Sequence, residues 1–276
     1  MSRPAVLLVV SCTIVVSQVT LPVSAGIATI TTADGNGADA TVNGIINLVD
    51  YSGSNRGAYQ NLSARWWLSG EESAFQKSWI RLDLPNDIDT ITDARLELFW
   101  NRSNPKPRDF EVLGLMESAD YGFNSLTGEL RLGEDWAEDQ VAWNNAPGNV
   151  DSRTSNDLNR AYVQSLYTFF SPFDPQTVST PSGAPTQNLI DFLNSDTNGM
   201  VTFMVRRPTL SGVVGYFATK ENIDPATHAP RLVLEYTPVP EPGSILVFAG
   251  LFAVGLLLRL VIGQDAFTSH DAPKAS

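Results

Sequence analysis

Aromatic and arginine side chains gather in one stretch of the sequence, AYQNLSARWWLSG, at residues 58–70. Tryptophan and tyrosine offer flat apolar faces for a pyranose ring, and an adjacent arginine can bind sugar hydroxyls or a uronate carboxylate. On a strand, Trp66 and Trp67 must point to opposite faces, so we expect one in the core and one at the surface. Arg65 then shares a face with Trp67. The candidate carbohydrate-binding residues are Tyr59, Arg65, Trp66, Trp67 and Trp79.

A glycine-rich loop, ADGNGAD at residues 33–39, carries oxygen ligands of the kind that calcium prefers. These ligands are Asp34, Asn36 and Asp39. Their spacing is not that of an EF-hand, and Asp-Gly-Asn-Gly is also ordinary turn chemistry, so a simple turn is the alternative. A structural calcium ion is the one cofactor that the sequence suggests.

Residues for nucleophilic catalysis are scarce. Histidine occurs only at His228 and His270, and the single cysteine is Cys12. Carboxylates that could act on glycosides are Glu71, Glu72, Glu134, Asp135, Glu138 and Asp139. Adjacent acidic residues in loops are usually solvated charge, so we expect no enzymatic activity. A polysaccharide-cleaving enzyme is the alternative.

The charge of the 276-residue chain excludes one class of partner. Its formal net charge is −12, and only 17% of its residues are charged. Binding to phosphates requires clustered lysine and arginine, so no nucleic-acid partner is expected.

Strand patterns dominate between Gly26 and Thr237. QKSWIRLDL (76–84) and ARLELFW (94–100) alternate as strands with one buried face do. Further candidate strands are 39–42, 45–50, 62–68, 110–116, 140–143, 163–169, 200–206, 213–219 and 230–236. Many short strands between Gly, Pro, Asn and Ser turns predict an all-β fold, an antiparallel β-sandwich of jelly-roll type over residues 26–236. One short helix is expected at 186–196, and a loose insertion at 150–185.

The first 25 residues have the pattern of a secretory signal peptide. Arg3 is followed by an apolar run and then by the small residues Val23-Ser24-Ala25. We predict cleavage between Ala25 and Gly26. Because Cys12 lies inside this segment, the mature chain would have no disulfide.

A second apolar segment lies near the other end of the chain. The proline-rich residues 237–244 read as a spacer that leaves the domain. A helix over 245–262 would be about 27 Å long, close to the roughly 30 Å hydrocarbon core of a membrane. Arg259 could reach the headgroups, and residues 263–276 form a tail. A single hydrophobic helix that contacts the membrane is therefore expected.

The residues Pro240, Glu241 and Pro242, followed by a hydrophobic run and Arg259, resemble the PEP-CTERM sorting signal of Gram-negative envelopes. That resemblance implies processing by a membrane enzyme of the exosortase type and a setting of exopolysaccharide and biofilm formation. The basic cluster that usually follows the helix is here reduced to Arg259. The resemblance places the protein in the envelope or outside the cell, with the anchor retained or removed.

The body of the chain is similar to the DNRLRE family of secreted bacterial β-sandwiches. The resemblance covers roughly residues 33–236 and is carried by WIRLDLP (79–85), ITDARLELFW (91–100), DWAEDQVAWNNAP (135–147), YFATKE (216–221) and APRLVLEY (229–236). It departs by extra residues between 51 and 77 and by the insertion after Asn149. Some family members bind alginate-like polysaccharides, so the resemblance implies a carbohydrate-binding module.

Taken together, the residues and the two resemblances predict an exported, non-catalytic, envelope-associated protein. Its expected partner is extracellular polysaccharide, which it binds or organises. The first alternative is a structural matrix or adhesin protein whose sandwich contacts other proteins. The second alternative is the polysaccharide-cleaving enzyme.

Overall fold

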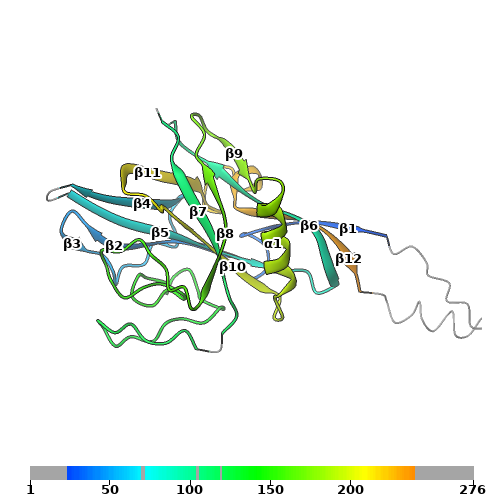
Figure 1. The fold of residues 1–276 in the computed structure, drawn as a ribbon, viewed down its shortest axis with the longest axis horizontal. Coiled ribbons are helices and arrows are strands. Elements are labelled where there is room, and N and C mark those ends of the chain that lie inside the picture. The colour runs from blue at the N-terminus through cyan, green and yellow to red at the C-terminus, as the bar shows by residue number, and fades with distance from the viewer. Residues whose placement is uncertain (1–23, 70–71, 104–105, 119, 240–276) are drawn as a thin grey trace, which may run out of the picture.

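The structure is a computed structural model that describes residues 24–69, 72–103, 106–118 and 120–239. Within these ranges the chain forms antiparallel strands and two helices (Figure 1). The strands are β1 (Gly26–Thr31), β2 (Ala38–Ile46), β3 (Val49–Asp50), β4 (Asn61–Ser69), β5 (Glu72–Asp83), β6 (Ile88–Trp100), β7 (Asp109–Leu115), β8 (Val163–Phe170), β9 (Gln176–Ser179), β10 (Met200–Arg206), β11 (Ser211–Ala218) and β12 (Arg231–Pro238). The helices are α1 (Ala184–Asn194) and α2 (Pro225–His228).

The sheet folds back on itself into two layers. Its hydrogen-bonded order is β1-β12-β6-β11-β4-β5-β10-β7-β8, so β7 is far from β6 and β11 along the sheet. The ring of Phe110 on β7 nevertheless lies 5.7 Å from the ring of Trp100 on β6 and 5.4 Å from that of Phe217 on β11. Such contacts require one half of the sheet to face the other. The predicted all-β, sandwich-like antiparallel fold is therefore confirmed at this level.

The main core lies between the two layers. Alternate residues of each strand point inward, as the two-residue period of a strand requires. Helix α1 closes one side of this core against β6 and β8 (Figure 1) and buries Leu189, Phe192 and Leu193. The inward-facing residues include Leu62, Ile80, Leu82, Leu96, Leu98, Trp100, Phe110, Val112, Phe203, Val205, Phe217, Leu232 and Leu234.

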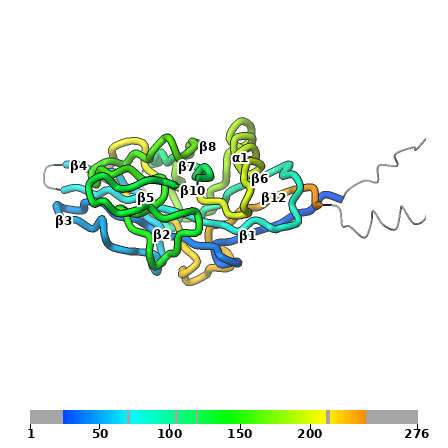
Figure 2. Tube along the Cα trace, turned by 90° about the horizontal axis from the view of Figure 1, so that it is seen from below, coloured from blue at the N-terminus to red at the C-terminus, as the bar shows by residue number. Residues whose placement is uncertain are grey.

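A second core lies on the outer face of the layer that contains β2, β5, β10 and β7. It is covered by residues 116–118 and 120–162, which we call the covering segment. This segment lies against β2 and β5 in both views (Figures 1 and 2). Trp136 and Trp143 of this segment are fully buried, as expected for core residues. They pack in one cluster with Phe75 and Trp79 of β5 and with Met204 of β10. Strand β5 is consequently buried on both faces, although its alternating sequence had predicted only one buried face.

Polar residues on the second face of β5 are buried because the covering segment supplies partners. Lys77 is fully buried, and its Nζ donates to Asn149 Oδ1 at 2.7 Å and to the carbonyl oxygen of Asp157. The same ammonium lies 4.1 Å from the centroid of the Trp143 ring. Arg81 donates to the carbonyl oxygens of Asn36 and Trp136.

Most predicted strands are confirmed, and the differences are local. The strands expected at 39–42, 62–68, 76–84, 94–100, 110–116, 163–169, 200–206, 213–219 and 230–236 correspond to β2, β4, β5, β6, β7, β8, β10, β11 and β12. The range 45–50 is divided by a turn between β2 and β3. The strand expected at 140–143 is wrong, because these residues form turns of the covering segment.

The segment 150–185 is not the loose insertion that was expected. It contains β8, which pairs with β7, and β9, which pairs with β6. The predicted helix at 186–196 is confirmed as α1, which begins two residues earlier. Pro185 fits there because the first helical residues need no backbone N–H donor within the helix.

The first and last described strands are neighbours. Strand β1 pairs with β12, and Gly26 lies opposite Tyr236 (Figures 1 and 2). A Cβ on Gly26 would lie 2.6 Å from the Tyr236 ring, so glycine is required for this close approach. Of the predicted cleavage pair, Ala25 precedes β1 and Gly26 is its first residue. Residues 1–23 of the predicted signal peptide, Pro240, Glu241, Pro242, Arg259 and the predicted hydrophobic helix lie outside the described residues.

No helix within the described residues is both long and apolar enough to span a membrane.

Candidate functional site

The outer face of β4 and β11 brings arginine and aromatic side chains together. Arg65 and Trp67 occupy alternate positions of β4 and therefore share its outer face. Tyr216 of β11 lies opposite Ser63 of β4 and so belongs to the same face. Arg102 follows the end of β6, and its guanidinium lies 5.4 Å from the centroid of the Tyr216 ring. We call Arg65, Trp67, Arg102 and Tyr216 the arginine–aromatic face.

The cations of this face are not neutralised within the described part of the chain. Neither Arg65 nor Arg102 forms an ion pair with a described carboxylate. Burial lowers the pKa of Arg65, and nearby Arg102 acts in the same direction, while Tyr216 and Glu72 oppose the shift. The Nε of Arg65 and the Nε1 of Trp67 are buried without a hydrogen-bond partner. The face therefore holds positive charge without a described carboxylate partner, in a protein whose net charge is −12.

The arrangement suits one class of ligand chemistry. Trp67 and Tyr216 are half-buried, so part of each ring is open to solvent, and Arg102 is exposed. Flat apolar rings stack on sugar rings, and guanidinium groups form charge-assisted hydrogen bonds with carboxylates. Beside them, Asn101 Nδ2 donates to Asn61 Oδ1 at 2.8 Å, which fixes two amides that can contact hydroxyls.

Two of the other predicted sugar-binding residues lie away from this face. Trp66 points to the opposite side of β4 and packs against the second core. Tyr59 is 51% exposed, but it precedes β4 in a loop, where the Arg56 guanidinium lies 4.9 Å from its ring. The expectation that one of the adjacent tryptophans faces the core and the other shares a side with Arg65 agrees with this geometry.

The assignment of Trp79 to carbohydrate binding is wrong. Its side chain is completely buried, and its Nε1 donates to the carbonyl oxygen of Pro147 at 3.1 Å. No ligand can stack on a ring that the covering segment encloses. The sequence concealed this role because the covering segment that buries Trp79 lies more than 30 residues away along the chain.

The predicted calcium ligands are not brought together. Asp34 Oδ2 accepts from the backbone and hydroxyl of Thr31, and Asn36 donates from its backbone and its side chain to Asp83. Asp39 Oδ2 instead accepts from the Thr32 hydroxyl at 2.5 Å. The described residues contain no group of three acidic, histidine or cysteine side chains suited to a metal ion. Asp34, Asn36 and Asp39 therefore form a turn and its supports, which was the alternative explanation.

Asp39 is instead a buried carboxyl beside other charges. Its Oδ2 also accepts from the backbone N–H of Lys220 at 3.1 Å, and its Oδ1 is buried without a partner. Burial raises the pKa of Asp39 to about 7, and the charges of Glu221 and Glu138 add to this effect. Hydrogen bonds from Thr32 and Lys220 oppose it.

The substitution Asp39→Asn should stabilise the protein at alkaline pH. The folded-state pKa lies above the unfolded value of 3.8, so stability is greatest at low pH and falls as pH rises toward and through 7. An amide keeps the acceptor oxygen and carries no charge. We expect a gain on the order of 2 kcal/mol at pH 8 and a much smaller one at pH 5, measured by urea unfolding. Thr32→Val should instead increase the loss of stability with rising pH, because the hydrogen bond from Thr32 lowers the pKa of Asp39. An equal Asp39→Asn effect at both pH values would contradict this assignment.

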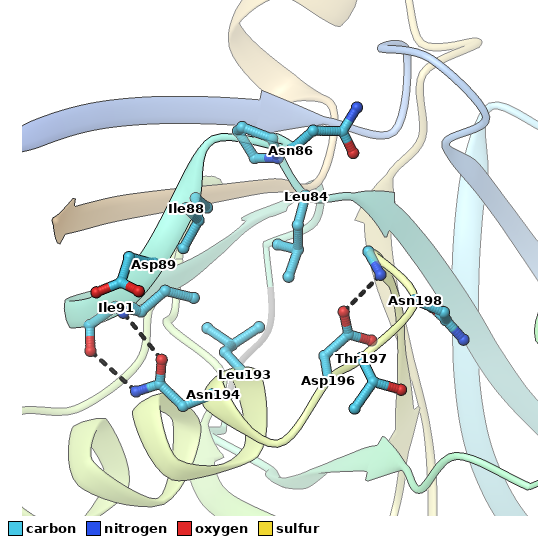
Figure 3. A pocket seen from close by; sticks show the side chains of 12 residues that line it. Leu84, Asn86, Ile88, Asp89, Ile91, Leu193, Asn194, Asp196, Thr197 and Asn198 are labelled. Atoms are coloured by element: carbon cyan, nitrogen blue, oxygen red, sulfur yellow. Dashed lines mark hydrogen bonds between the residues drawn. The ribbon is translucent and has the colours of Figure 1, made fainter. Parts of the chain in front are cut away.

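A polar pocket of about 280 Å³ lies where the β5–β6 turn meets the segment after α1 (Figure 3). Its apolar lining is Leu84, Ile88, Ile91 and Leu193, and its polar lining includes Asn86, Asp89, Asp196 and Asn198. The Asn194 side chain exchanges hydrogen bonds of 2.9 and 3.0 Å with the backbone of Ile91, which ties the helix end to β6. The described lining has neither an aromatic ring nor a cation, and its carboxylates would repel an acidic glycan.

Three carboxylates near this pocket are used to hold loops. Glu117 accepts from the backbone and the hydroxyl of Thr197, and Glu134 accepts from Tyr121 and Asn198. Burial raises the pKa of Asp196 to about 6, and the charges of Glu117 and Glu134 add to the shift. These bonds fasten the 196–199 turn to the covering segment. The sequence had singled out only Glu134 of this group.

Comparison with known proteins adds no assignment, since no family model and no curated protein matches this chain.

Two residues of the arginine–aromatic face were not predicted from the sequence. They are Arg102, which follows β6, and Tyr216 of β11. Tyr216 precedes the buried Phe217 on the same strand, and this alternation indicates that Tyr216 points outward. The pairing of β11 with β4, however, cannot be predicted from the sequence.

Proposed function

We propose that this protein is an exported, envelope-associated and non-catalytic module that binds extracellular polysaccharide through the arginine–aromatic face. The proposal includes a β-sandwich of jelly-roll type. It also includes an N-terminal signal peptide and a C-terminal sorting segment that an exosortase-type enzyme processes. The observation that carries it is the pair of arginines Arg65 and Arg102, which form no ion pair with a described carboxylate, beside the half-buried rings of Trp67 and Tyr216.

Three further observations support this function. The carboxylates of Glu117 and Glu134 are occupied by loop contacts, which favours binding over cleavage. The two ends of the described chain leave from one edge of the sheet, which suits attachment at one end of the domain. Three of the four residues of the arginine–aromatic face lie on strands, and sites on strands are held more precisely than sites on loops.

The substitution pair Arg65→Gln and Arg102→Gln should abolish most binding to acidic glycans. Each removes a charge-assisted contact with a uronate carboxylate, so we expect roughly a tenfold or greater loss of affinity for alginate or pectin. Affinity electrophoresis of the full-length protein in gels that contain these polymers measures the retardation. Added salt should weaken the wild-type retardation.

Arg95→Gln is the matched control, because Arg95 is an exposed arginine on β6 outside the face. It should leave retardation unchanged. Absence of wild-type retardation by alginate, pectin and neutral glycans alike would remove the proposal. Release of reducing ends or unsaturated sugars by the wild type would replace it with a cleaving enzyme.

A further inference from the structure

Apolar side chains are exposed together at one end of the molecule. Leu48 and Val49 lie in the β2–β3 hairpin, and Phe123, Leu126 and Leu130 lie in the covering segment. Each is more than half exposed. We call these five residues the tip surface. Exposed apolar side chains gathered in neighbouring segments often mark a surface that another molecule covers.

Ion pairs and backbone bonds join the two parts of the tip surface. Arg153 donates to Asp50 Oδ2 at 2.5 Å, and its carbonyl oxygen accepts from the backbone N–H of Ile45 at 3.1 Å. Residues 151–154 and Leu126 line one open groove of about 640 Å³. The β2–β3 hairpin therefore adjoins the groove that Leu126 borders.

Leu48 is unfavourable for the hairpin itself. Asn47 and Leu48 have φ values of 47° and 65°, the left-handed region in which asparagine and glycine are preferred. A leucine there carries a steric cost, and its side chain is 69% exposed, so packing within the chain does not compensate. An apolar contact with another molecule would account for leucine at this position.

The apolar loop of the covering segment is held rigidly. Phe123 and Leu130 form a β-bridge. Asn124 between them is fully buried, accepts from the backbone N–H of Leu126 at 2.9 Å and donates to the carbonyl oxygen of Asn144 at 3.2 Å. Arg131 anchors the end of the loop through Asp151 at 2.5 Å. A rigid loop loses little conformational entropy when it binds.

We propose that the tip surface is where a second copy of this chain binds. Two ion pairs of opposite sign border it, Asp50 with Arg153 and Asp151 with the buried Arg131, while Glu129 adds one exposed negative charge. Asp50 and Arg153 remain partly exposed, so across a twofold axis each can also meet its opposite on the other copy. Two chains of net charge −12 repel each other, and contact is favoured where most of the local charge is paired.

The position of the tip surface permits this contact in an attached protein. Strand β3 lies at the opposite end of the molecule from the start of β1 and the end of β12 (Figure 1). A domain held by either of those ends would present the tip surface outward. The inference does not depend on glycan binding, because the arginine–aromatic face is made of other residues.

Sedimentation velocity of the full-length protein in a mild non-ionic detergent tests the proposal. The wild type should form dimers at micromolar concentration, and Leu126→Glu should weaken dimerisation by roughly tenfold or more. Ile223→Glu is the matched control, since Ile223 is 91% exposed in the loop before α2, and it should dimerise as the wild type does. A monomeric wild type up to about 100 μM, or equal dimerisation of Leu126→Glu, would overturn the proposal.

Leu48→Gly provides an independent variant that cannot fail by unfolding. Glycine relieves the left-handed backbone, so the urea midpoint should rise while dimerisation weakens. A rise in the midpoint with unchanged dimerisation would exclude Leu48 from the contact and count against the proposal. Flotation with phosphatidylglycerol vesicles, if lost in Leu126→Glu without any change in sedimentation, would assign the tip surface to lipid instead.

Discussion

Trp79→Ala should lower the free energy of unfolding by about 4 kcal/mol. The Trp79 side chain is completely buried in the second core, beside Trp136 and Met204. Truncation removes its apolar burial, leaves a cavity that rigid strands fill poorly, and removes the donor to the carbonyl oxygen of Pro147. Equilibrium urea unfolding, followed by tryptophan fluorescence, measures the change in midpoint.

Trp67→Ala is the matched comparison, because it removes the same side chain from a half-buried position. It should cost less, about 2 kcal/mol, since part of the ring is already in contact with solvent. The two variants should also separate in binding: folded Trp79→Ala keeps its retardation by alginate, and Trp67→Ala loses it. Similar stability losses in the two variants would show that the second core is not packed as described.

The difference between these tryptophans marks the limit of sequence reasoning for the site. A two-residue period places Arg65 and Trp67 on one face without further information. It does not say which strand lies beside β4, so Tyr216 and Arg102 entered only with the register of β11. Adjacency between strands is decided by long-range packing, which local alternation does not contain.

The fold, like the site, could be predicted from the sequence only where the pattern within a single strand decides the structure. Strands with alternating apolar residues were found because period and burial agree, as in β6 and β12. The four-residue β9 was missed because it is too short for its alternation to be distinctive. Strand β5 was assigned one buried face because Lys77 and Arg81 interrupt its second face, yet both are buried with partners from distant loops.

The covering segment explains why so much of the pattern was hidden. It has no helical period, and the one strand that its sequence predicted, at 140–143, is not formed. Its buried polar residues, including Asn124 and Asn149, are recognisable as core only after the sheet beneath them is known. Specific hydrogen bonds, such as that from Trp136 Nε1 to the Thr202 hydroxyl at 3.1 Å, replace the repeating bonds of secondary structure there.

Glu111→Ala should destabilise the protein by about 3 kcal/mol or more. Glu111 on β7 and Arg206 on β10 form an ion pair of 2.6 Å, and their side chains are only 8% and 7% exposed. The Ser165 hydroxyl donates to the same carboxylate at 2.7 Å. Removing the carboxylate leaves the Arg206 guanidinium buried, with Asp157 and the Asn156 carbonyl oxygen as its remaining partners among the described residues.

The ion pair of Glu111 and Arg206 predicts that stability depends on pH with the opposite sign to the dependence expected from Asp39. Burial alone would raise the pKa of Glu111, but the hydrogen bond from Ser165 and the charge of Arg206 lower it below 4.5. Its contribution to stability is therefore present above pH 4.5 and is lost as pH falls through the depressed folded-state pKa. Acid titration of the unfolding midpoint in wild type and Glu111→Gln measures this contribution.

The double variant Glu111→Leu with Arg206→Met distinguishes a buried charge penalty from lost packing. Because desolvation offsets most of the attraction within a buried pair, replacing both partners with apolar residues of similar size should restore most of the stability lost in Glu111→Ala. If the double variant is as unstable as Glu111→Ala, the pair contributes through its geometry and its bond with Ser165. Recovery instead means that the cost of the single substitution comes from the buried Arg206 guanidinium, which is left without the Glu111 carboxylate.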